Sequence, residues 1–318
     1  MRKWAWGVAM WAAAGAVLAQ APAWPDKPVR VIVPFPASGA TDLVARVVTQ
    51  RVAADLGQQM VVDNKPGAGG TIGSAEAAKA PPDGYTLLLT TSSTHAISPH
   101  LMPRLAYDAR KDFTPVAHLA DAPSVLLVTN SLPVKTVGEL IAYGKAHPGK
   151  LTLGNTGTYT SPHVTSAIIA QQLGLDVVHV PYKGSAELMR ATMAGEVMVA
   201  ADTSAVIPYV DQGRMVALNV WTEKRLPTLP HTPTLIELGL PTTQYSPFGL
   251  VGPKGMPADV QAILHKAFKE AMEMESYQAM LQRFEMLPIY MNSADYKKFA
   301  AESTVKEKAV LAKLGPQA

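Results

Sequence analysis

Four polar parts of the chain carry groups that can do chemistry. The first is PFPASGATD at residues 34–42, which stands between an apolar run and a long helical pattern. The others are TTSSTH at 90–95, GNTGTYTSPH at 154–163, and Asp202 at the end of EVMVAAD. Hydroxyl groups and the free N–H groups of a helix N-terminus bind anions such as carboxylates. These residue types therefore favour the binding of a negatively charged ligand.

Each part also has a purely structural interpretation, and the residues alone leave both open. Thr41 or Asp42 can cap the helix after the first segment, while Gly39 lets the backbone come close to a ligand. The hydroxyls of residues 90–94 are also ordinary in a turn. Asp202 either accepts a hydrogen bond from a ligand or caps the segment that follows it.

The segment at 154–163 is the most informative of the four. A strand end and small polar residues precede a helix that we expect Ser161 to cap, with Pro162 in its first turn. Such a terminus offers free N–H groups and the positive end of the helix dipole. Tyr159 lines a pocket or lies on the surface, and His163 is structural or contacts a ligand.

No pattern in the chain predicts catalysis or metal binding. Neither G-x-S-x-G nor H-E-x-x-H occurs, and the 8 histidines are scattered. The glycine-rich stretch at 66–73 lacks the Gly-Lys-Ser/Thr of a P-loop, so we interpret it as a turn. The chain has 0 cysteines, which excludes disulfides and thiolate chemistry. We expect no catalytic residue, no metal and no cofactor.

Composition indicates a globular protein of about two domains. The chain has 318 residues, 48% of them hydrophobic and 17% charged, which suffices for buried cores. The net charge is only +3, without a cluster of lysines or arginines, so a nucleic-acid partner is not expected.

Residues 1–23 predict export from the cytoplasm. The segment MRKWAWGVAMWAAAGAVLAQAPA has a basic start, an apolar stretch and small residues near its end. This is typical of a secretory signal peptide cleaved after Ala19, Ala21 or Ala23, and the alternative is a membrane anchor. No other stretch reaches the ~18 apolar residues of a transmembrane helix.

From Trp24 onward, strand and helix patterns alternate in two blocks, which predicts two α/β lobes with largely parallel sheets. We expect 24–126 and 247–318 to form lobe 1, and 127–246 to form lobe 2. The chain is expected to cross between lobes near 124–130 and 245–253. Such sheets bind ligands at the carboxyl ends of their strands, where the four polar parts and the 181–185 loop fall.

Local signals set several element boundaries. Thr136 and Glu139 have the spacing of a capping box, and Gly57 is placed to end the first long helix. The run PVAHLADAPSVLLVTNSL at 115–132 is predicted to form two separate strand pieces.

Six stretches of the chain together resemble a known family. They are WPDKPVRVIVPFPASGATD, VVDNKPGAGGTIGSAEAAKAPPDGYTLLL, FTPVAHLA, HPGKLTLGNTGTYTSPH, HVPYKGSAELMRATMAGEVMVAAD and FGLVGPKGMP. The chain resembles the periplasmic substrate-binding proteins of tripartite tricarboxylate transporters, often called the Bug family. The resemblance covers nearly all of the chain after the signal peptide. It implies a two-lobed Venus flytrap, in which two α/β lobes joined by hinge strands close on a small carboxylate.

The resemblance also implies a ligand site. The first loop meets one end of the ligand through backbone N–H groups and water, and the 156–161 loop meets it from the second lobe. This chain departs from the family at Ser38, where adjacent glycines are usual, and at Tyr159, where a small residue is common. The ligand-binding residues implied are Phe35, Ala37, Ser38, Gly39, Asp42, Thr91, Ser92, Thr94, Thr156, Gly157, Thr158, Tyr159, Ser161, His163 and Asp202.

The expected function follows from this resemblance. A monomeric periplasmic protein would capture a small monocarboxylate or dicarboxylate, aromatic acids included, without catalysing a reaction. It would then deliver the acid to the membrane subunits of a tripartite tricarboxylate transporter. Two alternatives remain open. One is a ligand sensor that presents its closed form to a signalling receptor, and the other is a periplasmic hydrolase, which would need a nucleophile and a base side by side.

Overall fold

The computed structural model describes residues 24–312, which fold around a 9-stranded sheet. Its order is β2-β1-β3-β9-β4-β7-β5-β6, with β8 also paired to β4. The strands are β1 (Val29–Val33), β2 (Met60–Asn64), β3 (Thr86–Thr90), β4 (Phe113–Thr129), β5 (Leu151–Asn155), β6 (Val177–Pro181), β7 (Val199–Thr203), β8 (Met215–Val220) and β9 (Tyr245–Pro253).

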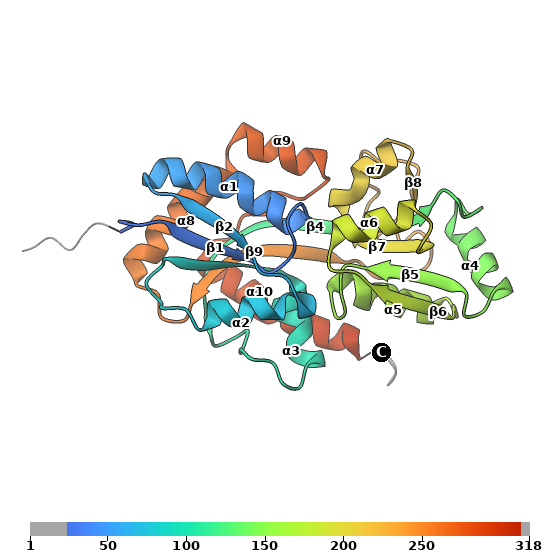
Figure 1. The fold of residues 1–318 in the computed structure, drawn as a ribbon, viewed down its shortest axis with the longest axis horizontal. Coiled ribbons are helices and arrows are strands. Elements are labelled where there is room, and N and C mark those ends of the chain that lie inside the picture. Colours follow the sequence, from blue (N-terminus) through green and yellow to red (C-terminus); the bar gives the residue numbers. More distant parts are fainter. Residues whose placement is uncertain (1–23, 313–318) are drawn as a thin grey trace, which may run out of the picture.

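The sheet consists of two parallel blocks joined by antiparallel strands. In one block β1 is parallel to both β2 and β3, and in the other β5 is parallel to both β6 and β7. Strands β4 and β9 are antiparallel to each other and lie between the blocks. Figure 1 shows the two blocks side by side along the long axis of the molecule. The predicted α/β class is therefore confirmed, with two parallel blocks within one sheet.

Strand β4 corrects one sequence expectation. The run at 115–132 was expected to form two strand pieces, but Phe113–Thr129 is one continuous strand of 17 residues. It pairs with β9 as far as Pro123, then with β7 from Ser124 and with β8 from Val125. Proline lacks the N–H that pairing inside a sheet needs, so a proline in an apolar run usually indicates the end of a strand. Pro115 and Pro123 therefore suggested breaks that the structure does not have. A register shift after Pro115 accommodates the first of these prolines.

Helices cover both faces of each half of the sheet (Figure 1). The α-helices are α1 (Ala40–Leu56), α2 (Thr71–Ala78), α3 (Ser98–Leu101), α4 (Val137–Ala146), α5 (Ser161–Gln172), α6 (Ser185–Met193), α7 (Ile207–Asp211), α8 (Ala258–Met272), α9 (Glu275–Arg283) and α10 (Ser293–Leu311). Shorter helical turns are η1 (Ala68–Gly70), η2 (Ser93–Ile97), which has π-helical bonding, and η3 (Ser204–Val206).

Strand alternation supplies two cores in the first half of the sheet. Val31 packs into the core beneath α1, α8 and α9, while the next residue, Ile32, packs into the core beneath α2 and α10. Successive side chains of a strand point to opposite faces, so one short apolar strand serves both cores. In the described part of the chain, no helix combines the length and apolar character needed to cross a membrane.

Two helix starts differ by one to three residues from those expected. The cap of α1 is Gly39, without a side-chain hydrogen bond, so neither Thr41 nor Asp42 caps this helix. The cap of α5 is Thr160, because the backbone is still extended there and Ser161 is already helical. The predicted end at Gly57 is confirmed by its left-handed φ of 65°.

The capping box of α4 is confirmed and gives a stability prediction. The Thr136 hydroxyl accepts the Glu139 N–H at 3.2 Å, and Glu139 accepts the Thr136 N–H at 3.1 Å. Thr136→Ala removes the first bond and is expected to lower the free energy of unfolding by about 1 kcal/mol. Thr136→Ser keeps the hydroxyl and is the matched control. Urea unfolding of the three proteins measures the difference, and equal stability of the alanine variant would contradict it.

Candidate functional site

A cavity of about 460 Å³, measured with its mouth, lies between the two halves of the sheet. The first half contributes the loop after β1 and the segment after β3, and β9 contributes Ser246 and Phe248 to the wall. The second half contributes the loops after β5 and β6 and the carboxyl end of β7. The lining residues are Phe35, Pro36, Gly39, Ala40, Thr41, Thr91, Ser93, Thr156, Thr160, Pro162, Gly184, Ser185, Asp202, Thr203, Ser246 and Phe248.

Three helix N-termini converge on this cavity. Gly39 belongs to the start of α1, Thr160 to the start of α5 and Gly184 to the start of α6. They meet because each helix follows the carboxyl end of a parallel strand. None of the three caps makes a side-chain hydrogen bond, so the first-turn N–H groups of α1 and α6 remain available. In α5 the Ser161 N–H is bonded to Ser93 and Pro162 has no N–H, so this helix contributes mainly its dipole. Each terminus also carries about half a positive charge, which attracts an anion.

The positive charge in the cavity comes from the backbone rather than from basic side chains. None of the described residues that line it is a lysine, arginine or histidine. Phe35 and Phe248 add aromatic surface to the wall. The cavity can therefore hold a carboxylate by N–H groups, hydroxyls and water, with its carbon chain against the rings. Within residues 24–312, no three His, Asp or Glu side chains gather in a way that could hold a metal ion.

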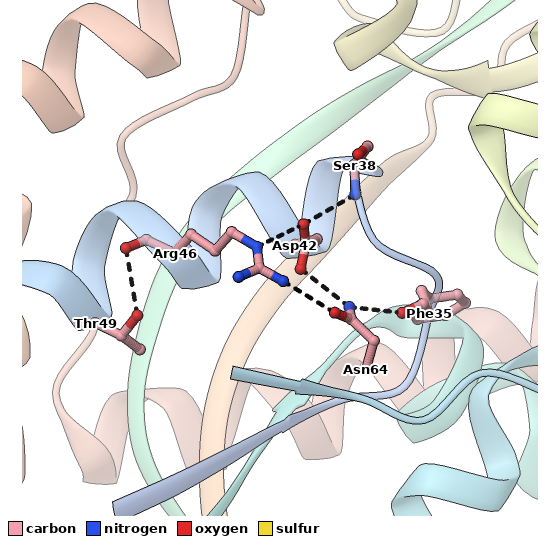
Figure 2. A network of polar contacts seen from close by, with 6 residues as sticks. All are labelled: Phe35, Ser38, Asp42, Arg46, Thr49 and Asn64. Atoms are coloured by element: carbon pink, nitrogen blue, oxygen red, sulfur yellow. Dashed lines mark hydrogen bonds and ion pairs between the residues drawn. The ribbon is translucent and has the colours of Figure 1, made fainter. Parts of the chain in front are cut away.

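Asp42 fixes the first loop from behind (Figure 2). Its Oδ2 accepts the Ser38 N–H at 2.9 Å and the Arg46 Nε–H at 2.9 Å. Its Oδ1 accepts from Asn64 Nδ2 at 3.0 Å, and the same amide donates to the Phe35 carbonyl at 3.0 Å. Asp42 and Ser38 therefore hold the loop in shape and are not among the lining residues. Ser38 adopts the left-handed φ of 68° that glycine usually takes.

In the TTSSTH segment at 90–95, Thr91 and Thr94 use their hydroxyl groups differently. Thr91 lines the cavity, and its buried Oγ1 has no hydrogen-bond partner in the described part of the chain. Thr94 instead bonds internally, donating to the Thr91 carbonyl at 3.2 Å. Ser93 also lines the cavity and accepts the Ser161 N–H at 3.1 Å, which links the two halves of the molecule. The Ser92 hydroxyl, which has no hydrogen-bond partner among residues 24–312, is buried but lies outside the lining.

Asp202 lies at the end of β7 with its side chain almost completely buried. One oxygen, Oδ1, accepts the Thr203 N–H at 2.7 Å, and Oδ2 has no partner among the described residues. Burial raises the pKa of Asp202 to about 6, although the Thr203 N–H and the Ser185 hydroxyl act in the opposite direction. At neutral pH the cavity thus contains one acceptor oxygen that a ligand hydroxyl, amine or bridging water can satisfy.

The structure divides the residues predicted from sequence into three groups. Those in the cavity lining are Phe35, Gly39, Thr91, Thr156 and Asp202. Gly157 and Thr158 line a neighbouring, wider cavity instead, which Phe35 and Thr156 also border. Outside both linings are Ala37, Ser38, Asp42, Ser92, Thr94, Tyr159, Ser161 and His163.

Tyr159 is turned toward an apolar cluster between the two halves, and His163 lies beside it. Tyr159 has a φ of 63° and packs on a cluster that includes Ile97, Val164 and Leu311. Its N–H donates to His163 Nδ1 at 3.1 Å, and burial with the nearby His179 lowers the pKa of His163 to about 4. His163 is thus a neutral acceptor that fixes the loop.

Sequence reasoning did not identify several lining residues. Ser185 belongs to the 181–185 loop, whose position was expected to face the site, but no residue of that loop was singled out. Ser246 and Phe248 lie in β9, which was interpreted only as a crossing strand. Their neighbours in sequence are apolar or proline, so no local signal distinguishes them from residues of a core strand.

This architecture defines the class of periplasmic binding proteins. Residues 44–315 match the model of the tripartite tricarboxylate transporter family receptor (TctC), and the chain belongs to this family. It is 43% identical over 297 residues to the UPF0065 protein in the gbd 5′ region of Cupriavidus necator, covering 93% of this chain and 90% of the relative. The family and the fold predicted from sequence are therefore confirmed.

Two solved structures show the same fold with a bound acid. Rpa4515 of R. palustris with adipate is 32% identical, with a TM-score of 0.87. The match covers 91% of this chain and 98% of the Rpa4515 chain. MatC from Rhodopseudomonas palustris with bound malate is 30% identical, with a TM-score of 0.85. That match covers 91% of this chain and 100% of MatC.

The Asp42 network gives a pH-dependent prediction. Burial alone would raise the pKa of Asp42, but hydrogen bonds from Arg46, the Ser38 N–H and Asn64 outweigh it and hold the pKa below 3.8. The carboxylate therefore stabilises the fold above its unfolded pKa, and this contribution is lost as the pH falls through the lower folded value. Asp42→Asn is expected to cost about 1–3 kcal/mol at pH 7.

Urea unfolding at pH 7 and pH 3 measures this effect. The difference in free energy of unfolding between Asp42→Asn and wild type is expected to be smaller at pH 3. Asp55→Asn is the control, because Asp55 forms only a partly exposed pair with Arg51. Its expected cost is about 0.5 kcal/mol or less. A gap that stays constant across both pH values would contradict the role given to the Asp42 charge.

Variants of Thr91 and Thr94 are expected to affect ligand binding and stability separately. Thr91→Val removes an unpartnered hydroxyl that lines the cavity and is expected to weaken carboxylate binding about tenfold without lowering the melting temperature. Thr94→Val removes an internally bonded hydroxyl and is expected to lower stability by about 1 kcal/mol. Calorimetric titration and thermal unfolding of both variants test this contrast. The assignment is wrong if Thr91→Val binds as wild type does.

Proposed function

We propose that this protein is a periplasmic solute-binding protein that captures a small organic carboxylate between two lobes. One observation carries the proposal: three helix N-termini meet at a single cavity, those of α1 and α6 with free N–H groups, and no described residue lining it has a basic side chain. A carboxylate satisfies these N–H groups, whereas a neutral solute leaves the dipoles uncompensated. Adipate and malate in two structurally similar proteins support an organic acid of this size.

The lobes in this proposal are 24–126 with 247–318, and 127–246. Strands β4 and β9 would act as the hinge, because β4 exchanges partners between Pro123 and Ser124. The ligand would dock on one lobe and favour closure through contacts with the other, since only differential contacts shift such an equilibrium. The closed form would then deliver the acid to the membrane subunits of a tripartite tricarboxylate transporter.

The same proposal includes export to the periplasm through cleavage of the signal peptide predicted at residues 1–23, which lie outside the described residues. It also assigns any preference for aromatic ligands to residues other than Tyr159, which the sequence had suggested. Tyr159 faces a core cluster, so a ring-bearing acid would meet Phe35 and Phe248 instead. Stacking or edge contacts with these rings are the available source of preference for an aromatic ligand.

A thermal-shift screen with matched acid and amide pairs tests the proposal. Each carboxylate is compared with its uncharged amide, for example malate with malamide and adipate with adipamide. An acid at ~100 times its dissociation constant is expected to stabilise the protein by roughly 2.7 kcal/mol, and its amide by much less. Ser185→Leu, which fills the cavity, is expected to abolish the shift. No response to any carboxylate, with no acid co-purified, would contradict the function.

A further inference from the structure

The loop after β1 and the loop after β6 meet at one point across the cavity. An alanine Cβ placed at Gly184 would lie 2.9 Å from Cγ and 3.0 Å from Cδ of Pro36. Unstrained carbon atoms stay about 3.5–4.0 Å apart, and the proline ring cannot rotate away. The backbone at Gly184 is extended, with φ 170° and ψ −176°, so any residue can adopt it. Glycine is therefore needed there for close approach and not for conformational freedom.

A second close approach links the same two halves. An alanine Cβ at Gly69, in the glycine-rich stretch, would lie 2.8 Å from the Thr158 carbonyl oxygen. Gly157 lies on the same side, since its Cβ would be 4.0 Å from Gly69 Cα. The glycine-rich stretch was interpreted as a simple turn, but it packs against the loop after β5. Pro36 and Gly184 border the main cavity, and Gly69 and Thr158 border the wider one.

We propose that the Pro36–Gly184 contact limits how closely the lobes approach, and that Gly184 is a positioning residue for ligand binding. This inference rests on the proposed function. Helices α1 and α6 can both donate N–H groups to one ligand only if their loops come within hydrogen-bond reach of it. A methyl group at Gly184 would separate the loops by about 1 Å, and a hydrogen bond of ordinary length does not survive that displacement.

The expected consequence is a loss of affinity without loss of a ligand-contacting group. Gly184→Ala is expected to weaken binding about 10- to 100-fold, which corresponds to one lost hydrogen bond to a charged group. The double variant Pro36→Ala, Gly184→Ala removes Cγ and Cδ of the ring, which are the two closest obstacles. It is expected to recover most of the wild-type affinity. Recovery by a second truncation separates a steric limit from general damage to the fold.

Gly138→Ala is the matched control in the same lobe. Gly138 lies in α4, and a Cβ there would meet nothing closer than the Thr136 Oγ1 at 4.0 Å. This variant is expected to bind and close as wild type does. Melting temperatures of all variants check that each is folded before binding is compared.

Closure is measured directly, without any ligand, by spin-label distances. The chain has 0 cysteines, so two can be introduced cleanly. Ser276→Cys on α9 and Gln212→Cys after α7 place labels on exposed positions of opposite lobes. Gly184→Ala is expected to shift the distance distribution to longer values, and the double variant is expected to restore it. An unchanged distribution in Gly184→Ala, with the protein folded, would overturn the closure contact.

Malate and adipate serve as probes for the binding arm. If wild type binds either acid and Gly184→Ala binds it equally well, the positioning role is wrong although the carboxylate function stands. If wild type binds neither these acids nor any other carboxylate of the thermal-shift screen, while the label distances change as expected, the closure contact stands and the proposed ligand class is what fails. The two conclusions are therefore tested separately.

Discussion

The antiparallel pairing of β4 with β9 is the interaction on which the rest of the fold depends. These strands lie between two parallel blocks, and β4 leaves β9 for β7 and β8 between Pro123 and Ser124. The strand therefore belongs to both halves, and its partner change sets where one half ends and the other begins. The cavity forms at this boundary, with Phe248 of β9 in its wall. A shorter β4 would not pair with strands of both blocks and would leave them without a shared strand.

The arrangement of the strands around β4 and β9 also determines the electrostatic potential of the cavity. Parallel strands end at the same edge of their block, and each is followed by a helix whose N-terminus faces the boundary. Three such termini meet in one cavity and attract an anion without a lysine or arginine. Fixed backbone dipoles give less charge than a guanidinium, but they lose no side-chain entropy when a ligand binds. Asp202, at the end of β7, adds one acceptor oxygen and so makes the cavity uneven in charge.

The loops that carry these groups are held by contacts behind the cavity. Asp42, Arg46 and Asn64 fix the backbone around Phe35 and Ser38, so that this loop needs no ligand to keep its shape. In the other half the Tyr159 N–H is tied to His163. The small residues serve a different purpose, because glycine allows backbone segments of opposite halves to approach closely. Rigid loops and close approach together let one small ligand contact both halves.

The sequence by itself determined the alternation of strands and helices, the end of α1 at Gly57, the capping box at Thr136 and the family. These features depend on residues close together in the chain, where periodicity and backbone preference act directly. Only the tertiary structure decided which loop residues reach the cavity. Phe35, Thr91 and Asp202 line it, whereas Tyr159 turns to a core built from Ile97 and Leu311, and Ser246 joins from a strand that looks like core. A side chain's direction is set by packing among segments far apart in sequence, and no local pattern records that packing.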